Sequence, residues 1–170
     1  MSPVATALKP QAHVEKMDIG LDAAYRKDMS ESLSQILAAT YRLTIKNHIY
    51  HWNVVGPLFR PLHELTEEHY NTLFQAVDII AERIRALGHL APASIGDAAN
   101  FSPRKSSVDN LAAIDMVEDL IADHETSVKA MRKAAEKAGD AGDVVTEDML
   151  TARLTFHEKA LWMLRAIISE

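Results

Sequence analysis

The sequence predicts an all-α fold, a bundle of four long helices, and three observations predict it. Glycine and proline, which interrupt helices, number only six each in 170 residues. Between them, apolar residues recur three and four positions apart, as on one face of an amphipathic helix. No stretch shows the strict alternation of a half-buried strand, and no internal repeat is present.

The first predicted helix spans residues 28–55. Asp28 is placed to cap it, and Glu31, three residues later, is placed as in a capping box. One stripe of this helix predicts a face toward the bundle core, but a second side is partly apolar too. A helix that is apolar on two sides is usually buried on two sides, so we expect a partner subunit to cover the second side. That side carries Tyr41, Ile45, His48 and Trp52.

The remaining helices follow from turn signals. Gly56-Pro57 ends the first helix, and the second is predicted over residues 59–87 with Gly88 as its C-terminal cap. A third helix is predicted over residues 107–138. Thr146 opens the fourth.

The longest connection, residues 89–106, joins the second and third helices and has about 18 residues. A structureless loop of that length is uncommon in a compact domain, so we expect a short extra helix around residues 93–100. Four helices with one long crossover are the layout of ferritin-like folds. By its length the chain is one bundle domain, residues 28–170, behind an N-terminal extension, residues 1–27, that we expect to be partly flexible.

Composition excludes several classes of function. The absence of cysteine excludes disulfides, thiolate nucleophiles and thiolate metal ligands. No run approaches the ~18 apolar residues of a membrane span, and the first residues lack the layout of a signal peptide, so we expect a cytoplasmic protein with no membrane partner. The net charge of −6 disfavours nucleic acid as the main partner, because phosphate binding needs a basic surface.

Five side chains that can bind metal follow one another around the first turn and along the second helix. They are His51, His63, Glu67, Asp78 and Glu82, separated by eleven, three, ten and three residues. The two pairs that are four positions apart each share one helix face. Imidazole and carboxylate ligands together suit iron, manganese or zinc. Each residue alone has an ordinary alternative, because helical carboxylates are usually solvated and a lone histidine is usually structural.

A single chain cannot join these five residues in one site. Glu67 and Asp78 share a face of the second helix but lie about 16 Å apart along it, at 1.5 Å per residue. The third and fourth predicted helices lack the Glu-x-x-His pairs that complete an internal di-iron site. If the histidines bind metal, further carboxylates must come from elsewhere. An antiparallel second chain, related by a two-fold axis, would bring its Asp78 and Glu82 opposite and give each dimer two identical sites.

Residues 51–88 resemble the Dps family, the DNA-binding proteins of starved cells, which are mini-ferritins. Three motifs carry the resemblance at the family's spacing: HWN, LHE and D-x-x-AERI. The helix layout fits the family over about residues 28–168. The resemblance implies a hollow homododecamer that oxidises Fe(II) at two-fold interfaces, two irons to a site, with hydrogen peroxide or oxygen as the oxidant. It also implies that a ferric oxyhydroxide core is stored inside.

Carried over position by position, the resemblance implies a site shared by two subunits. One subunit supplies His51, His63 and Glu67, and its neighbour supplies Asp78 and Glu82. Many family members have aspartate where Glu67 stands, and the longer side chain bears on the spacing of the metals.

Two further features resemble parts of the family. Trp52 resembles a tryptophan beside the iron site that takes up stray oxidising equivalents, which makes it a candidate catalytic side chain; packing at an interface is the alternative. The segment GDAGDVVTED resembles the acidic lining of the family's three-fold pores, where Asp140, Asp143 and Asp148 would draw cations inward. A solvated acidic turn that also caps the fourth helix is the alternative.

Four other histidines do not fit the pattern of the site. His48 and His69 are expected in core or surface roles. His124 and His157 fall on the apolar stripes of the last two helices and are expected in the bundle core.

Two functions are compatible with these patterns. The first is a ferroxidase, an oxidoreductase that oxidises and stores iron and so protects the cell and its DNA from oxidative damage. The alternative is a nucleoid-packing, nucleoid-associated protein in which iron oxidation is secondary. Family members that bind DNA often use lysine-rich tails, whereas residues 1–28 carry four basic and four acidic side chains. We therefore expect DNA binding to be weak or absent.

Overall fold

The computed structural model describes residues 11–94, 96 and 111–169. Four long helices and no strand make up this part of the chain, which confirms the all-α prediction. The helices are α2 (Ala23–Asn53), α3 (Phe59–Ala86), α4 (Ala113–Asp140) and α5 (Val144–Ile167). No helix in the described ranges is long and apolar enough to cross a membrane.

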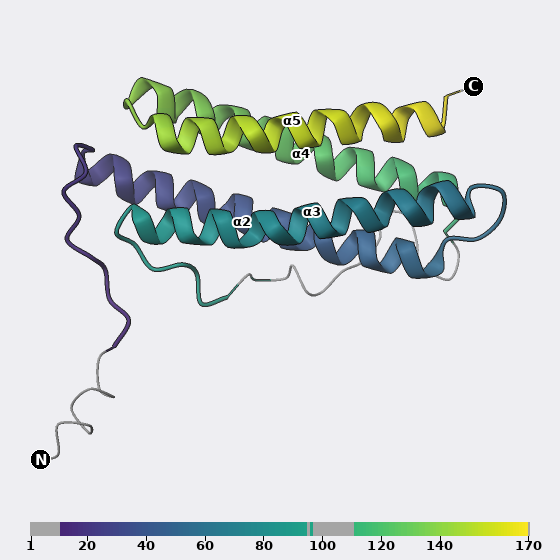
Figure 1. The fold of residues 1–170 in the computed structure, drawn as a ribbon, viewed down its shortest axis with the longest axis horizontal. Helices are drawn as coiled ribbons and strands as arrows, with labels where there is room; N and C mark the ends of the chain where they lie inside the picture. Colours follow the sequence, from purple (N-terminus) through teal and green to yellow (C-terminus); the bar gives the residue numbers. More distant parts are fainter. Residues whose placement is uncertain (1–10, 95, 97–110, 170) are drawn as a thin grey trace, which may run out of the picture.

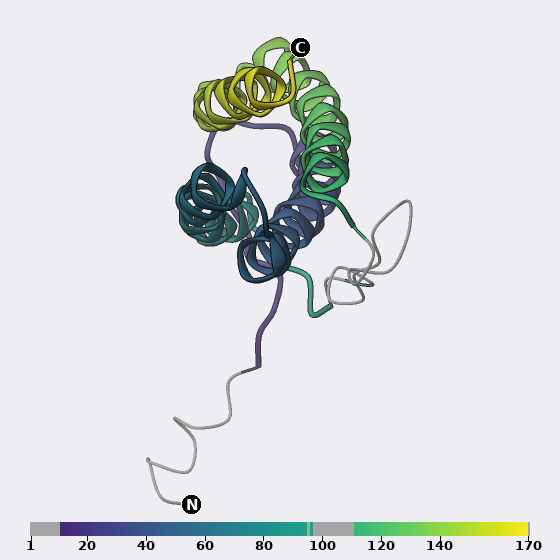
Figure 2. The ribbon, with the colours of Figure 1, turned by 90° about the vertical axis from the view of Figure 1, so that its right-hand side faces the viewer.

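The helices form two antiparallel pairs, α2 with α3 and α4 with α5, which stack as two layers (Figure 1). Viewed from the end, α2 packs along α4 and α3 lies on the side of α5 (Figure 2). α3 ends and α4 begins at opposite ends of the bundle (Figure 1). The turn between α2 and α3 therefore lies at one end of the bundle, and the turn between α4 and α5 lies at the other.

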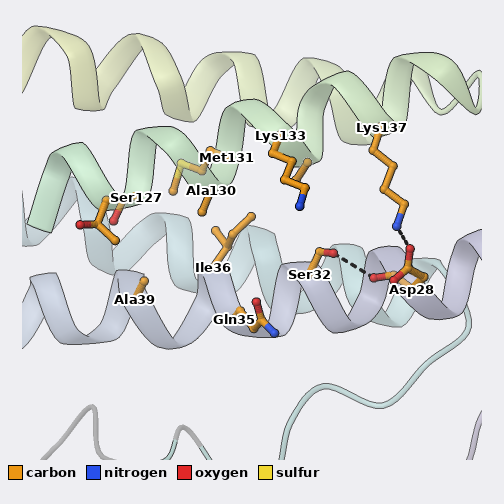
Figure 3. Close-up of a pocket in the computed structure, with 12 residues that line it drawn as sticks. Asp28, Ser32, Gln35, Ile36, Ala39, Ser127, Ala130, Met131, Lys133 and Lys137 are labelled. Atoms are coloured by element: carbon orange, nitrogen blue, oxygen red, sulfur yellow. Dashed lines mark hydrogen bonds and ion pairs between the residues drawn. The ribbon is translucent and has the colours of Figure 1, made fainter.

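α2 begins at Ala23, earlier than predicted, and it has a different cap. The carboxylate of Asp22 accepts hydrogen bonds from the backbone N–H groups of Ala24 (2.8 Å) and Tyr25 (3.0 Å). Asp28, the predicted cap, lies within the helix, and its carboxylate pairs with Lys137 of α4 (Figure 3). The capping prediction was wrong because the partner of Asp28 is on another helix and does not show in the local sequence.

A groove of about 420 Å³ runs between α2 and α4. Small side chains on both helices, among them Ser32, Ala39 and Ala130, leave it open (Figure 3). The ion pair between Asp28 and Lys137 stands at one end of the groove, where the Ser32 hydroxyl donates to the backbone oxygen of Asp28 (3.0 Å).

α3 follows its prediction closely and ends just before Gly88. Gly88 has φ +93°, and a Cβ on it would lie 2.8 Å from the backbone oxygen of Glu15. The backbone N–H of Glu15 donates to the carbonyl oxygen of Gly88 (2.7 Å). Glycine is therefore required here both by conformation and by the segment that crosses the end of α3.

α4 begins later than predicted, at Ala113, because Leu111 and Ala112 are not helical. The predicted start at Ser107 and most of the predicted short helix at residues 93–100 lie outside the described residues. Ile114, predicted on the core stripe, is 48% exposed in the first turn of α4. The other members of that stripe that are buried are Val117, Ile121, His124 and Met131.

Two apolar clusters and a group of buried polar side chains, called the polar layer, form the core. One cluster, toward the start of α2, contains Leu33 and Ile80, and the other, toward its end, contains Leu43 and Leu120. All four helices contribute buried polar side chains to the core, among them Asn47, His69, Asp123 and His157. A core with this polar layer holds charges that must be paired or neutralised.

Candidate metal centre

The end of α2 and the start of α3 bring two histidines face to face. The rings of His51 and His63 stack with their centroids 3.7 Å apart and their planes inclined by 16°. Nδ1 of each ring donates a hydrogen bond of 2.9 Å to the backbone oxygen of the other residue. Because a carbonyl oxygen only accepts, each neutral ring carries its proton on Nδ1 and a lone pair on Nε2. Nε2 is thus the atom that each ring can offer to a metal ion.

The turn between α2 and α3 fixes this pairing. Gly56 adopts φ +86°, which favours glycine, and its carbonyl oxygen accepts from the N–H of Phe59 (3.0 Å). Val54 and Leu62, on either side of the turn, are each 2% exposed and anchor both helix ends in the core. The two rings are therefore held by rigid elements.

Aromatic side chains border the histidine pair. The Phe59 ring lies 5.0 Å from that of His63, and Tyr70 meets His51 edge-on at 5.4 Å, centroid to centroid. These ring contacts restrict the motion of both imidazoles.

A second aromatic row leads outward from Tyr70. His48 stacks on Tyr70 with centroids 4.0 Å apart and on Trp52 with centroids 5.5 Å apart. Trp52 is 69% exposed. Sequence reasoning missed His48 and Tyr70 as neighbours of the site, although the four-residue spacing of His48 and Trp52 was an available signal.

The three predicted carboxylate ligands are exposed on α3. Glu67 lies one turn beyond His63, and partial burial together with the Glu67 carboxylate raises the pKa of Tyr70. Asp78 and Glu82 lie at least about 16 Å beyond Glu67 along the helix. Among the residues that the structure describes, no three histidine or carboxylate side chains converge closely enough to hold a metal ion. One chain thus joins the two histidines and leaves Asp78 and Glu82 apart from them.

Large apolar side chains are exposed among these residues. Trp52, Phe74 and Ile79 are 69%, 63% and 49% exposed. Phe74 stands one helical turn before Asp78, so apolar surface and carboxylate share a face of α3. Exposed apolar side chains in such number are typical of a protein–protein contact.

Comparison with known proteins decides the family. The sequence profile of the ferritin-like domain matches residues 30–170. The DNA protection during starvation protein 2 of Bacillus anthracis is 35% identical over 144 residues, which cover 85% of this chain and 99% of that protein. This chain belongs to the Dps family of ferritin-like proteins.

A solved structure and a further relative are also similar to this chain. The structure of a Dps protein from Vibrio cholerae, described as a member of a broad superfamily of ferritin-like diiron-carboxylate proteins, superposes with a TM-score of 0.80 at 27% identity. It covers 94% of this chain and 100% of that one. A low temperature-induced protein of Nostoc is 39% identical over 155 residues, 90% of this chain and 87% of that protein.

In this Dps chain the buried carboxylates of the bundle core face a lysine. Nζ of Lys46 lies 2.8 Å from Oδ2 of Asp119 and also pairs with Asp123, and all three side chains are at most 9% exposed. The Tyr50 hydroxyl donates to Asp119 as well. A cation of the protein itself therefore pairs with both of these carboxylates and balances one of their two negative charges.

Three buried histidines complete the polar layer. Nδ1 of His124 lies 2.9 Å from Nδ1 of His157, so one ring donates to the other, and His69 approaches His124 edge-on. Burial lowers the pKa of His69 to about 4 and that of His157 to about 3, and it lowers the pKa of His124 well below its usual value. All three rings are neutral at pH 7. The expectation that His124 and His157 are core residues is confirmed, since both are fully buried.

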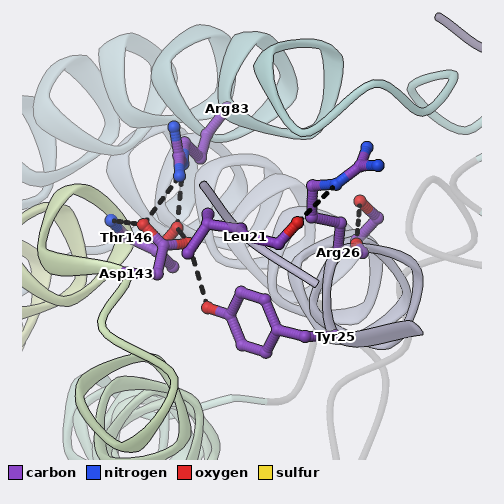
Figure 4. Close-up of polar contacts among 7 residues, drawn as sticks. Leu21, Tyr25, Arg26, Arg83, Asp143 and Thr146 are labelled. Carbon is purple, nitrogen blue, oxygen red and sulfur yellow. Dashed lines mark hydrogen bonds and ion pairs between the residues drawn. The ribbon is translucent and has the colours of Figure 1, made fainter. Parts of the chain in front are cut away.

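The acidic turn between α4 and α5 corrects one expectation. Asp143 is 2% exposed and caps α5, since its carboxylate accepts from the backbone N–H (3.0 Å) and the hydroxyl (2.6 Å) of Thr146. It also accepts from Arg83 (2.7 Å) and from the Tyr25 hydroxyl (2.9 Å) (Figure 4). Burial would raise the pKa of Asp143, but these hydrogen bonds outweigh burial and lower it.

Asp143 is therefore a buried structural residue of the single chain. Of the alternative expectation, a solvated acidic turn that also caps the fourth helix, Asp143 fulfils the cap but is buried and not solvated. Asp140 and Asp148, on either side of it, are exposed. A pore lining by these two remains a prediction.

Proposed function

We propose that this Dps chain is a ferroxidase that oxidises Fe(II), with hydrogen peroxide as the oxidant, at sites shared between two copies. Ferric mineral is then stored inside a hollow homododecamer, which removes both iron and peroxide and so protects the cell and its DNA. One observation carries the proposal: the chain holds two imidazoles with free Nε2 atoms, and within the described ranges it completes no metal site with them.

A second copy supplies what one chain lacks. In an antiparallel dimer, α3 of the second copy would run past the turn between α2 and α3. The carboxylates of that copy equivalent to Asp78 and Glu82 would then lie opposite the histidine pair. Such a contact would also cover the exposed rings of Trp52 and Phe74. A two-fold axis produces two equal sites per dimer. The bundle core is consistent with this assignment, because its buried carboxylates Asp119 and Asp123 are already paired with Lys46.

The ligand set suits the chemistry. Two imidazoles and three carboxylates around two ferrous ions leave coordination positions open for peroxide. Two ferrous ions each supply one electron, which together with two protons reduce one peroxide to two waters. Both electrons reach the peroxide at one site, so no hydroxyl radical is released. Trp52, next to His51 in the sequence and stacked on His48, is the side chain placed to reduce a stray oxidant.

Iron uptake is assigned to the acidic turn. Asp140, the last residue of α4, and Asp148, near the start of α5, are both exposed. Gathered from several subunits around a symmetry axis, such carboxylates would concentrate cations at one opening. This turn and the histidine pair lie at opposite ends of the bundle.

An anaerobic titration tests the function. Fe(II) is added without oxygen, followed by hydrogen peroxide at one molecule per two ferrous ions, and ferric absorbance and iron per shell are measured. We expect fast oxidation, soluble mineral and a dodecamer by light scattering. The variant His63→Ala should lose the fast phase, while His89→Ala, a partly exposed histidine at the far end of α3, should keep it. Oxidation at the same rate in His63→Ala would overturn the proposed site.

A further inference from the structure

We propose that Arg83 and Tyr25 are positioning residues for iron uptake: with Asp143 they fasten the acidic turn to the end of α3. This inference rests on the proposed function, because it concerns how iron reaches the shared site. We call the four residues that make these contacts the Asp143 latch: Tyr25, Arg83, Asp143 and Thr146.

The latch joins three parts of the bundle through one carboxylate. Arg83 comes from the last turns of α3, Tyr25 from the first turn of α2, and Asp143 with Thr146 from the start of α5 (Figure 4). The guanidinium of Arg83 makes two hydrogen bonds, to Oδ1 of Asp143 (2.7 Å) and to the Thr146 hydroxyl (2.8 Å). The side chain of Arg83 is 12% exposed and that of Asp143 is 1% exposed. A buried ion pair in which the guanidinium makes two hydrogen bonds fixes the relative orientation of the side chains as well as their separation.

The latch holds the backbone segment that carries the two exposed carboxylates of the acidic turn. Asp143 stands three residues after Asp140 and five before Asp148, so the backbone that carries both exposed carboxylates is held at its middle. On the α3 side, Arg83 directly follows Glu82, one of the proposed metal ligands. The same side chain thus ties the proposed uptake turn to the helix that carries part of the oxidation site.

If Arg83 acted only through its charge, its removal would change the rate of iron uptake in the opposite direction. Removing the positive charge of Arg83 would leave Asp143 unpaired and make the turn more negative, so electrostatic attraction alone would speed the uptake of Fe(II). If Arg83 acts by position, its removal lets the turn move, and uptake slows. The sign of the change therefore separates the two explanations.

The variants are chosen to remove one part of the latch each. Arg83→Met removes the fork and the charge, Arg83→Lys keeps the charge, and Tyr25→Phe removes one hydroxyl. The matched control is Arg42→Met, on α2. Arg42 is exposed, and its side chain makes no hydrogen bond or ion pair with the described residues.

Three measurements are made on assembled shells. In the first, Fe(II) is equilibrated with the protein without oxygen before peroxide is added, which reports on the oxidation site alone. In the second, Fe(II) is added last to protein and peroxide, which includes uptake. In the third, amide hydrogen exchange of residues 139–148 is followed without iron, which reports on the turn even if no oxidation occurs.

We expect Arg83→Met to slow the second reaction about fivefold or more and to leave the first unchanged. Amide exchange of the turn should be faster, Tyr25→Phe should show the same pattern more weakly, and Arg83→Lys should lie between Arg83→Met and the unchanged chain. If Arg83→Met does not assemble, Tyr25→Phe carries the test.

Three results would overturn the latch: unchanged or faster uptake, an equal loss in both reactions, or unchanged amide exchange. A wild-type shell that fails to oxidise iron in the first reaction would instead overturn the proposed function. Amide exchange would then still decide whether the turn is held by Arg83.

Discussion

The imidazoles of His51 and His63 hold each other in place: Nδ1 of each lies 2.9 Å from the backbone oxygen of the other. The hydrogen bonds are formed within one chain, before any metal or second subunit is present. They orient both rings and leave Nε2 of each available to a metal ion. In known metal sites, a hydrogen bond from the other ring nitrogen usually orients a ligating histidine in the same way. The histidine half of the proposed metal site is therefore already ordered in the single subunit.

The buried histidines predict a loss of stability on acidification. His69 and His157 have pKa values of about 4 and about 3 in the folded chain and 6.5 when unfolded. Between pH 6.5 and about 4 the unfolded chain therefore takes up protons that the folded chain does not. Stability is fully present above pH 6.5 and falls below it, by up to ~1.4 kcal/mol per pH unit for each buried histidine.

Urea unfolding at pH 7, 6 and 5 and one protein concentration measures this slope. The variant His157→Gln should flatten it by about one histidine's share. An equal slope in the His157→Gln variant would show that this ring is not buried and neutral.

The acidic turn predicts different effects for neighbouring aspartates. Asp143→Asn weakens a cap and leaves Arg83 without its buried partner, so we expect a loss of about 3 kcal/mol in the free energy of unfolding. Asp140→Asn and Asp148→Asn together should change stability by less than about 0.5 kcal/mol and should slow mineralisation. Thermal unfolding and the mineralisation rate are measured on the same shells. A normal mineralisation rate in the double variant would refute the uptake assignment.

Lys46 predicts a strong effect on folding that is separate from iron oxidation. Lys46→Met leaves Asp119 and Asp123 buried without their cation, which should cost about 3–5 kcal/mol. Adding Asp119→Asn and Asp123→Asn should restore much of that loss. Chemical unfolding measures both, and the restored triple variant should still oxidise iron. Loss of oxidation in a folded, assembled triple variant would place the reaction in the bundle core.

The charge of the chain predicts little affinity for DNA. With a net charge of −6, an assembled shell should not retard plasmid DNA at physiological salt and neutral pH. Weak binding at low salt is compatible with the few lysines of residues 1–28. A gel shift that persists at physiological salt would instead favour the nucleoid-packing function.

The sequence predicted the ends of helices correctly where residues close by in the chain determine them. Gly88 ended α3 as expected, because a positive φ at a helix end is a property of the residue itself. Asp28 was mistaken for a cap because its real partner, Lys137, is on another helix. The same limit hid the burial of Lys46, although Asp119 and Asp123, four positions apart beside an apolar stripe, were a signal for a buried cation.

The residues of the proposed site stay a prediction, and the sequence indicated only part of their geometry. Spacing showed that Glu67 and Asp78 could not share a metal, and the structure keeps them on one helix far apart. The reciprocal hydrogen bonds of His51 and His63 could not be foreseen, because they depend on how the turn brings two backbones together. The role of Asp143 was open for the same reason, since Arg83 and Tyr25 reach it from distant positions.

Mixed shells test the shared site most directly. His51→Ala damages one side of the proposed interface, and the double change Asp78→Ala with Glu82→Ala damages the other, so shells of either variant alone should lose fast peroxide-dependent oxidation. In shells reassembled from both, about half of the dimers are mixed, and each mixed dimer contains one complete site, so roughly a quarter of wild-type activity should return. Shells mixed from His51→Ala and His63→Ala subunits are the control and should recover nothing, because both changes lie on the same side. Recovery near a quarter in the first mixture alone is the predicted result, and no recovery in shells verified as mixed would contradict a site shared between subunits.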